Sequence, residues 1–429
     1  MKTKYALIVA CIFAGFAHAD DTPKNIIYMI GDGMGPAFTT AYRYYQDNPD
    51  TKEIEPTVYD AILVGMAKTY PDDDTFVTDS AASATALSSG VKSYNGAIAV
   101  DSDKKPVKTM LEIAKEQGMT TALIATSQIN HATPASFAAH NESRRNYDEI
   151  ADDYLDNEIK GHLPVDLLLG GGVRYFERED RNLAEEFKQQ GYQYLTDFEA
   201  LPSLQTLPAL GLFADKAFPF ALDENPTRLE VMTNKALSLL QRTDNGFFVM
   251  IEGSQIDWCG HANDIACAMA EMDDFAKSIA LAKAYVDAHP DTLLVVTADH
   301  STGGLTIGSD GKYRWDTEVI KGVRQTAWPL AMALAKSTDI RQAWSESVDW
   351  GLSDEQYQQL KQAKQSEEPV KALYQEVKDV INKQSYTGWT TKGHTAVDVQ
   401  VFAYGKGSQK FVGSQNNTDI AKQLIEFIQ

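Results

Sequence analysis

A strand-like apolar run, a polar or glycine-rich turn and an amphipathic segment recur in this order along the chain. The apolar runs contain almost no polar positions, a pattern typical of strands that are buried on both faces of a sheet. The predicted strands are residues 25–30, 121–125, 165–169, 247–251, 292–297 and 399–404.

The amphipathic segments between these runs predict helices. Residues 108–117 place their apolar side chains on one side, and Gly118 ends the segment. The other predicted helices are residues 227–240, 261–288, 354–364 and 417–428. Strands buried on both faces that alternate with helices predict an α/β fold, here a three-layer sandwich with a central, mainly parallel sheet.

Acidic and imidazole side chains directly follow several predicted strands. Asp32 follows the first strand, Glu252 ends the fourth, and Asp299 and His300 come after the fifth. Ligands of parallel sheets bind beyond the carboxyl ends of the strands. We therefore expect these side chains to gather at one edge of the sheet.

The segment from about residue 313 to residue 386 lacks the repeating pattern. It is polar, and it separates His300 from His394 in the sequence. We interpret it as an inserted crown or loop subdomain that leaves the sheet and returns. Its tryptophans form either a local core or a subunit contact; they are Trp315, Trp328, Trp344 and Trp350.

The first 19 residues have the features of a secretory signal. Lys2 and Lys4 precede an apolar run at residues 5–17, and Ala17-His18-Ala19 forms a small-x-small cleavage site. The run is shorter than the ~20 residues that a spanning helix needs. We predict a cleaved signal peptide at residues 1–19 and a mature domain at residues 20–429, periplasmic or secreted, with no membrane anchor after cleavage.

The chain is acidic, with a formal net charge of −21 and an ordinary globular composition of 43% hydrophobic residues. So negative a surface argues against nucleic-acid backbones and anionic membranes as partners. An anionic substrate would need bound metal ions that reverse the local field.

Cys259 and Cys267 are the cysteines of the predicted mature chain. If the predicted helix 261–288 extended back to include Cys259, the eight residues from Cys259 to Cys267 would separate the two Cα atoms by ~12 Å. A disulfide requires Cα atoms within ~7 Å, so we predict two free thiols. Cys259 is interpreted as a small packed residue rather than a metal ligand.

Ser80 lies where residues 78–87 predict the start of a helix. Free backbone N–H groups and the positive end of the helix dipole make this position favourable for phosphate, and a serine there can act as a nucleophile. Thr78, Asp79 or Ser80 could equally serve as an ordinary helix N-cap.

Asp257 and His261 are four residues apart and would share one face of a helix. An oxygen and a nitrogen ligand on neighbouring turns suit zinc. Asp299 and His300 form a second such pair. Buried charges without partners are costly, which favours metal binding over a structural role for these groups.

Six separated motifs resemble those of bacterial alkaline phosphatases, in the same order and across nearly the whole mature chain. They are Asp32–Gly35 (DGMG), Thr78–Thr85 (TDSAASAT), His131–Pro134 (HATP) with Ser143-Arg144, Glu252 with Asp257 and His261, Thr297–His300 (TADH) and Gly393–Thr395 (GHT). The resemblance implies a periplasmic or secreted phosphomonoesterase, commonly a homodimer, that acts on small phosphate monoesters.

By this resemblance Ser80 is the nucleophile and a metal ligand, and Arg144 clamps two phosphate oxygens. The implied cofactors are two Zn²⁺ ions, which activate the leaving group and the serine, and one Mg²⁺ ion. Their implied ligands are Asp257, His261 and His394 for the first zinc, Asp32, Asp299 and His300 for the second, and Asp32, Thr133 and Glu252 for magnesium.

Two positions depart from the enterobacterial pattern, with His131 in place of aspartate and Trp258 in place of lysine. Both would contact the substrate. The combination resembles marine and cold-adapted members of the family. A neutral imidazole and an indole should hold phosphate and magnesium less firmly, which predicts faster product release, a higher KM and a third site that also accepts zinc.

Three other functions compete with this one. A sulfatase would need a Cys/Ser-x-Pro-x-Arg motif, which is absent around Ser80. A related phosphodiesterase would generally use threonine and lack the magnesium ligands with the clamping Arg144. A periplasmic protein that only binds metal or phosphate would need no nucleophile. His140, His162 and His289 are interpreted as structural or surface residues.

Overall fold

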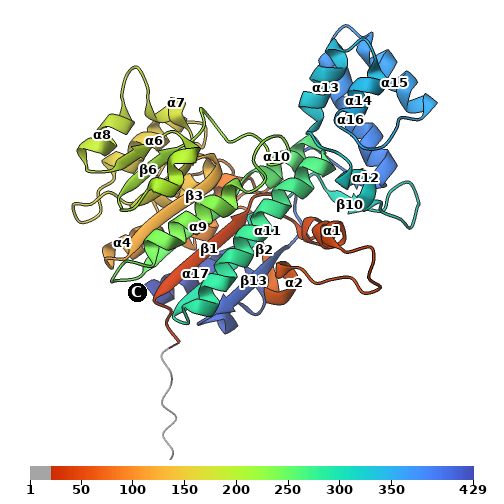
Figure 1. Ribbon diagram of the computed structural model, residues 1–429. Coiled ribbons are helices and arrows are strands. Elements are labelled where there is room, and N and C mark those ends of the chain that lie inside the picture. Colours follow the sequence, from red (N-terminus) through yellow and green to blue (C-terminus); the bar gives the residue numbers. More distant parts are fainter. Residues whose placement is uncertain (1–20) are drawn as a thin grey trace, which may run out of the picture.

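The computed structural model describes residues 21–429, and one ten-stranded sheet runs through its main body (Figure 1). The predicted signal peptide lies outside the described residues. The strand order is β14-β2-β13-β8-β1-β7-β3-β4-β6-β5. The strands are β1 Asn25–Gly31, β2 Leu63–Lys68, β3 Thr120–Gln128, β4 Leu167–Gly171, β5 Gln193–Leu195, β6 Ala209–Leu212, β7 Phe247–Gly253, β8 Thr292–Ala298, β13 Val399–Gly405 and β14 Gly413–Asn416.

The sheet is parallel apart from β13, which runs antiparallel to its neighbours β8 and β2. The central strands are buried along their length, as their uninterrupted apolar sequences require. This confirms the predicted central, mainly parallel sheet.

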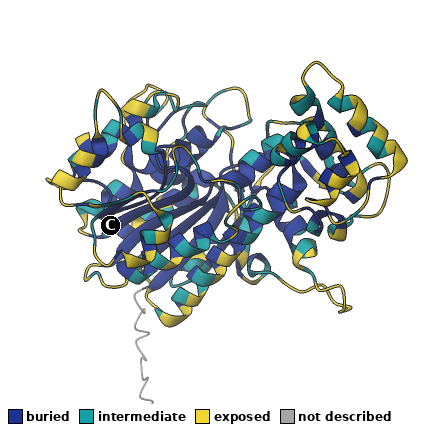
Figure 2. Cartoon of the chain, turned by 45° about the horizontal axis from the view of Figure 1, so that its top comes forward, coloured by how far each residue is buried: buried dark blue, intermediate teal, exposed yellow. Residues whose placement is uncertain are grey.

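Helices cover both faces of the sheet and complete three layers. Helices α9 and α11 pack on each other and cross in front of the sheet in Figure 1, whereas α17 packs with α3 and α4. The buried strands lie between these layers (Figure 2). The helices of the main body are α1 Pro36–Gln46, α2 Val58–Ile62, α3 Ser80–Ser89, α4 Met110–Glu116, α5 Ala132–Ala138, α6 Tyr147–Asp156, α7 Val173–Phe176, α8 Leu183–Gln189, α9 Arg228–Leu240, α10 Gln255–Ala262, α11 Ile265–Ala288 and α17 Asn417–Ile428.

The predicted helix 261–288 is in fact two helices, because the chain turns between α10 and α11. Asn263 adopts a left-handed conformation with φ 56°, which asparagine tolerates better than most residues. Asp264 then caps α11 by accepting a hydrogen bond from the N–H of Cys267.

This turn overturns the prediction of two free thiols. Cys259 and Cys267 form a disulfide, with their Cα atoms 5.5 Å apart. The expected separation of ~12 Å assumed one continuous helix. The turn at Asn263 folds the start of α11 back toward α10 and brings the two sulfur atoms together.

A helical lobe interrupts the chain between two short strands, β10 Leu305–Ile307 and β11 Thr387–Trp389, which pair antiparallel at its base. It projects to the upper right in Figure 1. Its helices are α12 Thr317–Lys321, α13 Ala327–Lys336, α14 Ile340–Ser345, α15 Asp354–Lys364 and α16 Pro369–Ser385. This lobe contains the predicted insertion 313–386.

The four tryptophans of the lobe differ in burial. Trp344 is buried and packs edge-to-face on Trp350, with ring centroids 5.1 Å apart, so this pair belongs to a local core. Trp315 is half-buried and bonds to Thr387. Trp328 is 47% exposed. Within residues 21–429, no helix is both long enough and apolar enough to cross a membrane.

Candidate metal centre

Three adjacent strands bring the predicted acidic residues to one edge of the sheet. β1 lies between β7 and β8, and its register places Ile30 beside Glu252 and Gly31 beside Ala298. Asp32 and Asp299 directly follow these paired positions. The prediction that the polar residues gather beyond the carboxyl ends of the strands is therefore confirmed.

Gly33 in the turn after β1 allows this close approach. Its φ is +71°, and a Cβ atom would lie 2.7 Å from Thr302 Oγ1 and 2.8 Å from Asp257 Cα. Its N–H donates to Asp299 Oδ1 at 3.0 Å. A side chain at this position would push the acidic residues apart.

The first group of potential ligands combines Asp257 and His261 of α10 with His394 of β12 (His394–Thr395). His261 Nε2 lies 3.2 Å from Asp257 Oδ2 and 3.2 Å from His394 Nε2. Each imidazole uses Nδ1 to donate to a backbone carbonyl, that of Lys392 for His261 and that of Thr78 for His394. This fixes the tautomer that presents Nε2 to a metal ion.

The second group comprises Asp32, Asp299 and His300. His300 Nε2 lies 3.2 Å from Asp299 Oδ2 and 3.5 Å from Asp32 Oδ1. All three side chains are fully buried. Both of these groups consist of the residues predicted for the two zinc sites.

The third group comprises Asp32, Glu252 and His131. Thr133 of α5, a predicted magnesium ligand, is buried beside them, and its hydroxyl has no hydrogen-bond partner among the described residues. The same holds for both carboxylate oxygens of Asp32 and for Glu252 Oε1. Uncompensated buried oxygens are rare, so this donor set fits hard or borderline divalent cations.

The electrostatics of the cluster agree with cation binding. Burial raises the pKa of Glu252 to about 7, and burial with the neighbouring charge of Asp257 raises that of Asp299 to about 7. The pKa of Asp32 is also raised, first by burial and then by Asp299. Burial lowers the pKa of His300, which keeps this imidazole neutral. Divalent cations would compensate the buried negative charge.

Ser80 is the first residue of α3 and stands beside the second group. Its Oγ lies 3.2 Å from His300 Nε2. Of the three residues that could cap this helix, Asp79 does so, because its side chain accepts from the N–H of Ala82 at 2.9 Å. The hydroxyl of Ser80 is therefore available for chemistry at the positive end of the helix dipole.

Arg144 reaches the same place from the loop before α6. Its Nη1 donates to Asp79 Oδ2 at 3.0 Å, and its Nη2 lies 3.4 Å from His131 Nε2. His131 contacts the ring of Trp258 edge-to-face at 5.8 Å. Burial, followed by the charge of Arg144, lowers the pKa of His131 to about 3.

Supporting residues around the centre were missed from the sequence. Asp79 was considered only as a helix cap, although it also orients Arg144. Ser254 donates to Glu252 Oε2 at 2.6 Å, and Thr302 donates to Asp257 Oδ1. Ser254 is only two residues from Glu252 and was overlooked, whereas the contacts of Thr302 with Asp257 and of Asp79 with Arg144 join segments far apart in the chain, so local sequence contains no signal for them.

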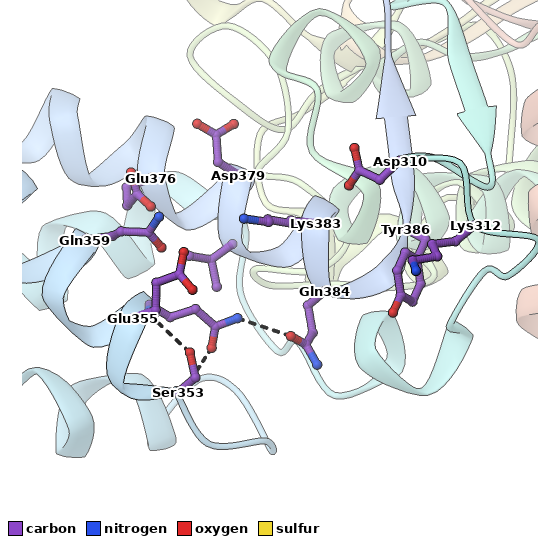
Figure 3. Close-up of a pocket in the computed structure, with 12 residues that line it drawn as sticks. Asp310, Lys312, Ser353, Glu355, Gln359, Glu376, Asp379, Lys383, Gln384 and Tyr386 are labelled. Atoms are coloured by element: carbon purple, nitrogen blue, oxygen red, sulfur yellow. Dashed lines mark hydrogen bonds between the residues drawn. The ribbon is translucent and has the colours of Figure 1, made fainter.

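Two histidines outside the centre have the structural role that the sequence predicted for them. His140 bonds to Ala99 O and to Glu112, and His289 stacks on Tyr285, so both are structural. A pocket between α15 and α16 contains none of the predicted ligands. Figure 3 shows several carboxylates along its wall, among them Glu355, Glu376 and Asp379.

Comparisons with known proteins agree on one family. The family model for alkaline phosphatase matches residues 23–429. Alkaline phosphatase 3 of Bacillus subtilis (strain 168) is 47% identical over 415 residues, which cover 95% of this chain and 90% of that protein. A cold-active alkaline phosphatase structure from a psychrophilic Shewanella sp. has a TM-score of 0.90 and 48% identity, covering 94% of this chain and 100% of that one.

A solved variant of the alkaline phosphatase from the Antarctic bacterium TAB5 is more distant. It has a TM-score of 0.71 and 31% identity, and the match covers 95% of this chain and 98% of that one. In this variant an aspartate replaces a histidine, and magnesium is bound in the site named M3.

Proposed function

The chain belongs to the alkaline phosphatase family and is a phosphomonoesterase, and from this premise we propose that it acts through a phosphoserine at Ser80, with two zinc ions and one magnesium ion. The position of Ser80 carries the proposal. Its hydroxyl stands at a helix N-terminus, within 3.2 Å of His300 in one ligand group and close to the guanidinium that Asp79 orients.

In the first step the hydroxyl of Ser80 gives its proton to solvent water, and Ser80 Oγ attacks phosphorus in line with the bond to the leaving oxygen. The P–O bond to Ser80 forms, the P–O bond to the leaving group breaks, and the released alkoxide takes a proton from water. In the second step the oxygen of a water molecule attacks phosphorus and the P–O bond to Ser80 breaks. A proton from that water restores the Ser80 hydroxyl through solvent, and inorganic phosphate leaves.

Arg144 and the N-terminus of α3 hold the phosphate during both steps. A planar guanidinium can bind two phosphate oxygens at once. The ion pair with Asp79 orients that guanidinium, and Asp79 simultaneously caps α3. One carboxylate therefore sets the relative positions of the nucleophile and the clamp.

The metal ions, when bound, would supply Lewis acidity at the entering and leaving oxygens. Asp257, His261 and His394 would hold one zinc, and Asp32, Asp299 and His300 the other. We assign Asp32, Glu252 and Thr133 to magnesium. The imidazole of His131 in this group favours zinc as an alternative occupant, because nitrogen ligands suit zinc better than magnesium. In the TAB5 variant, which has aspartate in place of a histidine, magnesium is bound in the site named M3, in line with the preference of magnesium for carboxylate oxygens.

We further propose that the protein is exported and forms a homodimer. The signal-like residues 1–19 support export, and the Cys259–Cys267 disulfide fits an oxidising compartment. N-terminal sequencing of the mature protein should begin at Asp20. Light scattering before and after deletion of the helical lobe would test the dimer and the role of the lobe in it.

Covalent labelling tests the central proposal. Incubation with radiolabelled inorganic phosphate at acidic pH should label the wild type at Ser80 and leave Ser80→Ala unlabelled. Metal analysis should find two zinc ions and one magnesium ion per chain, and His394→Ala should lose one zinc. Failure to label, together with failure to hydrolyse p-nitrophenyl phosphate in zinc and magnesium, would contradict the proposal.

A further inference from the structure

The hydroxyl of Thr302 connects two of the ligand groups, although Thr302 is not itself a proposed metal ligand. The residue ends the short strand β9 (Ser301–Thr302), and its side chain is fully buried. Its hydroxyl donates to Asp257 Oδ1 in the first group and lies 3.3 Å from His300 Nδ1 in the second. One neutral side chain therefore contacts a proposed ligand of each zinc ion.

The backbone of Thr302 is joined to two further segments of the centre. Its N–H donates to the carbonyl of Gly33 at 3.2 Å, in the residue that follows Asp32. β9 pairs antiparallel with β12, and the register places Thr302 opposite His394. These contacts hold the Thr302 backbone in a fixed position relative to the segments that carry Asp32 and His394.

Two glycines let the neighbouring segments close on the Thr302 side chain. A Cβ atom on Gly33 would lie 2.7 Å from its Oγ1, and a Cβ atom on Gly260 of α10 would lie 3.0 Å from its Cγ2. The hydroxyl therefore lies against the turn after β1, and the methyl group packs against α10. Because a β-branched side chain has few χ1 rotamers, this packing also fixes the direction of the hydroxyl.

The donor and the acceptor in each hydrogen bond follow from the chemistry of the partners. An ionised carboxylate can only accept, so the Thr302 hydroxyl gives its single proton to the bond with Asp257. The hydroxyl oxygen keeps its lone pairs and accepts the second bond, whose donor is the N–H of His300 Nδ1. The chain of hydrogen bonds thus runs from His300 through Thr302 to Asp257.

This direction places the proton of the neutral His300 imidazole on Nδ1. Nε2 is then left with its lone pair, 3.2 Å from Asp299 Oδ2 and 3.5 Å from Asp32 Oδ1. It is the nitrogen that a metal ion in the second group would bind. Backbone carbonyls fix the same tautomer in the two histidines of the first group, whereas a side-chain hydroxyl does so for His300.

Loss of the hydroxyl would affect both groups at once. A buried N–H without an acceptor is costly, so the His300 proton would move to Nε2, where Asp32 and Asp299 offer carboxylate oxygens. A proton on Nε2 occupies the nitrogen that a metal ion needs. Asp257 would at the same time lose the donor that orients its carboxylate in the first group.

We propose that Thr302 is a positioning residue for both zinc ions, because its hydroxyl selects the metal-binding tautomer of His300 and orients Asp257 at the same time. Thr302 acts on the reaction only through these two ligands. The inference rests on the proposed function, since it concerns the ligands of the two proposed zinc ions.

Zinc affinity tests this role in variants of the full chain. Metal-free protein is titrated with zinc in competition with a chromophoric chelator. Thr302→Val keeps the shape of the side chain without the hydroxyl, and both zinc equivalents should bind about 10–100-fold more weakly, the range for loss of an outer-shell partner. Thr302→Ser keeps the hydroxyl and should retain most of the wild-type affinity. Thr121→Val, which removes a buried hydroxyl bonded to Pro164 O at the start of β3, should leave zinc affinity unchanged.

The tautomer of His300 gives a readout that does not depend on bound zinc. Nitrogen-15 NMR of the metal-free protein, labelled at histidine, distinguishes a protonated ring nitrogen from an unprotonated one. The His300 signal is identified by its loss in His300→Asn. The proton should lie on Nδ1 in the wild type and on Nε2 in Thr302→Val. The wild-type spectrum decides the point even if Thr302→Val fails to fold.

Three results would overturn the role of Thr302. They are a proton on Nε2 of His300 in the wild type, unchanged affinity for either zinc ion in Thr302→Val, and equal weakening in Thr302→Ser, which would make the methyl packing responsible. If the wild type itself bound no zinc tightly, the proposed metal centre would be refuted, and the inference with it.

Discussion

Replacing Arg228 by methionine should lower the free energy of unfolding by about 3–5 kcal/mol, because it leaves two buried carboxylates without their cation. The guanidinium donates to Glu271 at 2.7 Å and to Asp274 at 3.2 Å. The three side chains are only 1–3% exposed. Arg228 also donates to Gln255, the first residue of the helix that carries Asp257, so the network supports the metal centre.

The loss should grow with pH. Even beside Arg228, burial raises the pKa of Asp274 to about 6. Without the arginine the folded-state pKa of Asp274 rises further, because the charge of Arg228 is what lowers it. A folded state that binds more protons than the unfolded state becomes less stable as the pH increases from about 4 toward the folded-state pKa. Each additional unit of pKa shift corresponds to about 1.4 kcal/mol, so the deficit should be larger at pH 8 than at pH 6.

Calorimetry at fixed zinc and magnesium concentrations measures this effect. With about 2.1 cal/mol/K of unfolding entropy per residue, a loss of about 4 kcal/mol corresponds to a Tm about 5 °C lower in a chain of this size. The further changes Glu271→Gln and Asp274→Asn should recover most of the loss. Arg174→Met breaks an exposed pair with Asp215 and should leave the Tm unchanged.

A loss of less than about 1 kcal/mol in Arg228→Met would refute this role of Arg228, because an uncompensated buried charge costs far more. No recovery of stability in the variants with the added amide substitutions would also refute it, because the loss would then come from packing and not from charge.

Three further outcomes are expected. Replacing both Cys259 and Cys267 by alanine should lower the free energy of unfolding by about 2.5 kcal/mol, because the disulfide closes a short loop. Reductant should lower the Tm of the wild type and leave the Tm of the variant unchanged. Equal responses of the two proteins would show that the disulfide does not form. His131→Asp should increase magnesium relative to zinc in metal analysis of the purified protein and lower the KM for phosphoesters, whereas an unchanged metal ratio and KM would count against the assignment of the third site. Burial alone would lower the pKa of His140, but its hydrogen bond to Glu112 raises this pKa. The wild type should therefore be more stable than His140→Gln by its full margin below about pH 6.5, and the margin should shrink as the pH rises through the folded-state pKa. Equal differences in Tm between the two proteins at pH 6 and at pH 9 would refute this.

The central strands were predictable because each is buried on both faces. The apolar runs at residues 25–30, 247–251 and 292–297 correspond to β1, β7 and β8 within two residues at either end. The edge strand β14 and its neighbour β2 were not predicted. β2 is largely exposed or half-buried, and β14 has the sequence GSQN, so neither contains the apolar pattern of a buried strand.

The turn at Asn263 shows why local periodicity misplaced a helix boundary. Residues 261–288 have a continuous helical pattern, and asparagine is compatible with both a helix and a left-handed turn. Hydrogen bonds from Lys378 and Asn382 to the carbonyls of residues 262 and 263 stabilise the end of α10 there. These donors come from α16, more than a hundred residues later in the chain.

The sequence by itself determined which side chains lie at the candidate metal centre, because acidic, imidazole and hydroxyl residues directly follow buried strands or begin helices. It therefore also determined that they meet at one edge of a parallel sheet. Only the tertiary structure decided that His131 lies with Asp32 and Glu252 in the third ligand group, that Asp79 joins the start of α3 to Arg144, and that two cysteines pair. Those relations depend on distances of a few ångströms between segments far apart in the chain, and local spacing does not encode such distances.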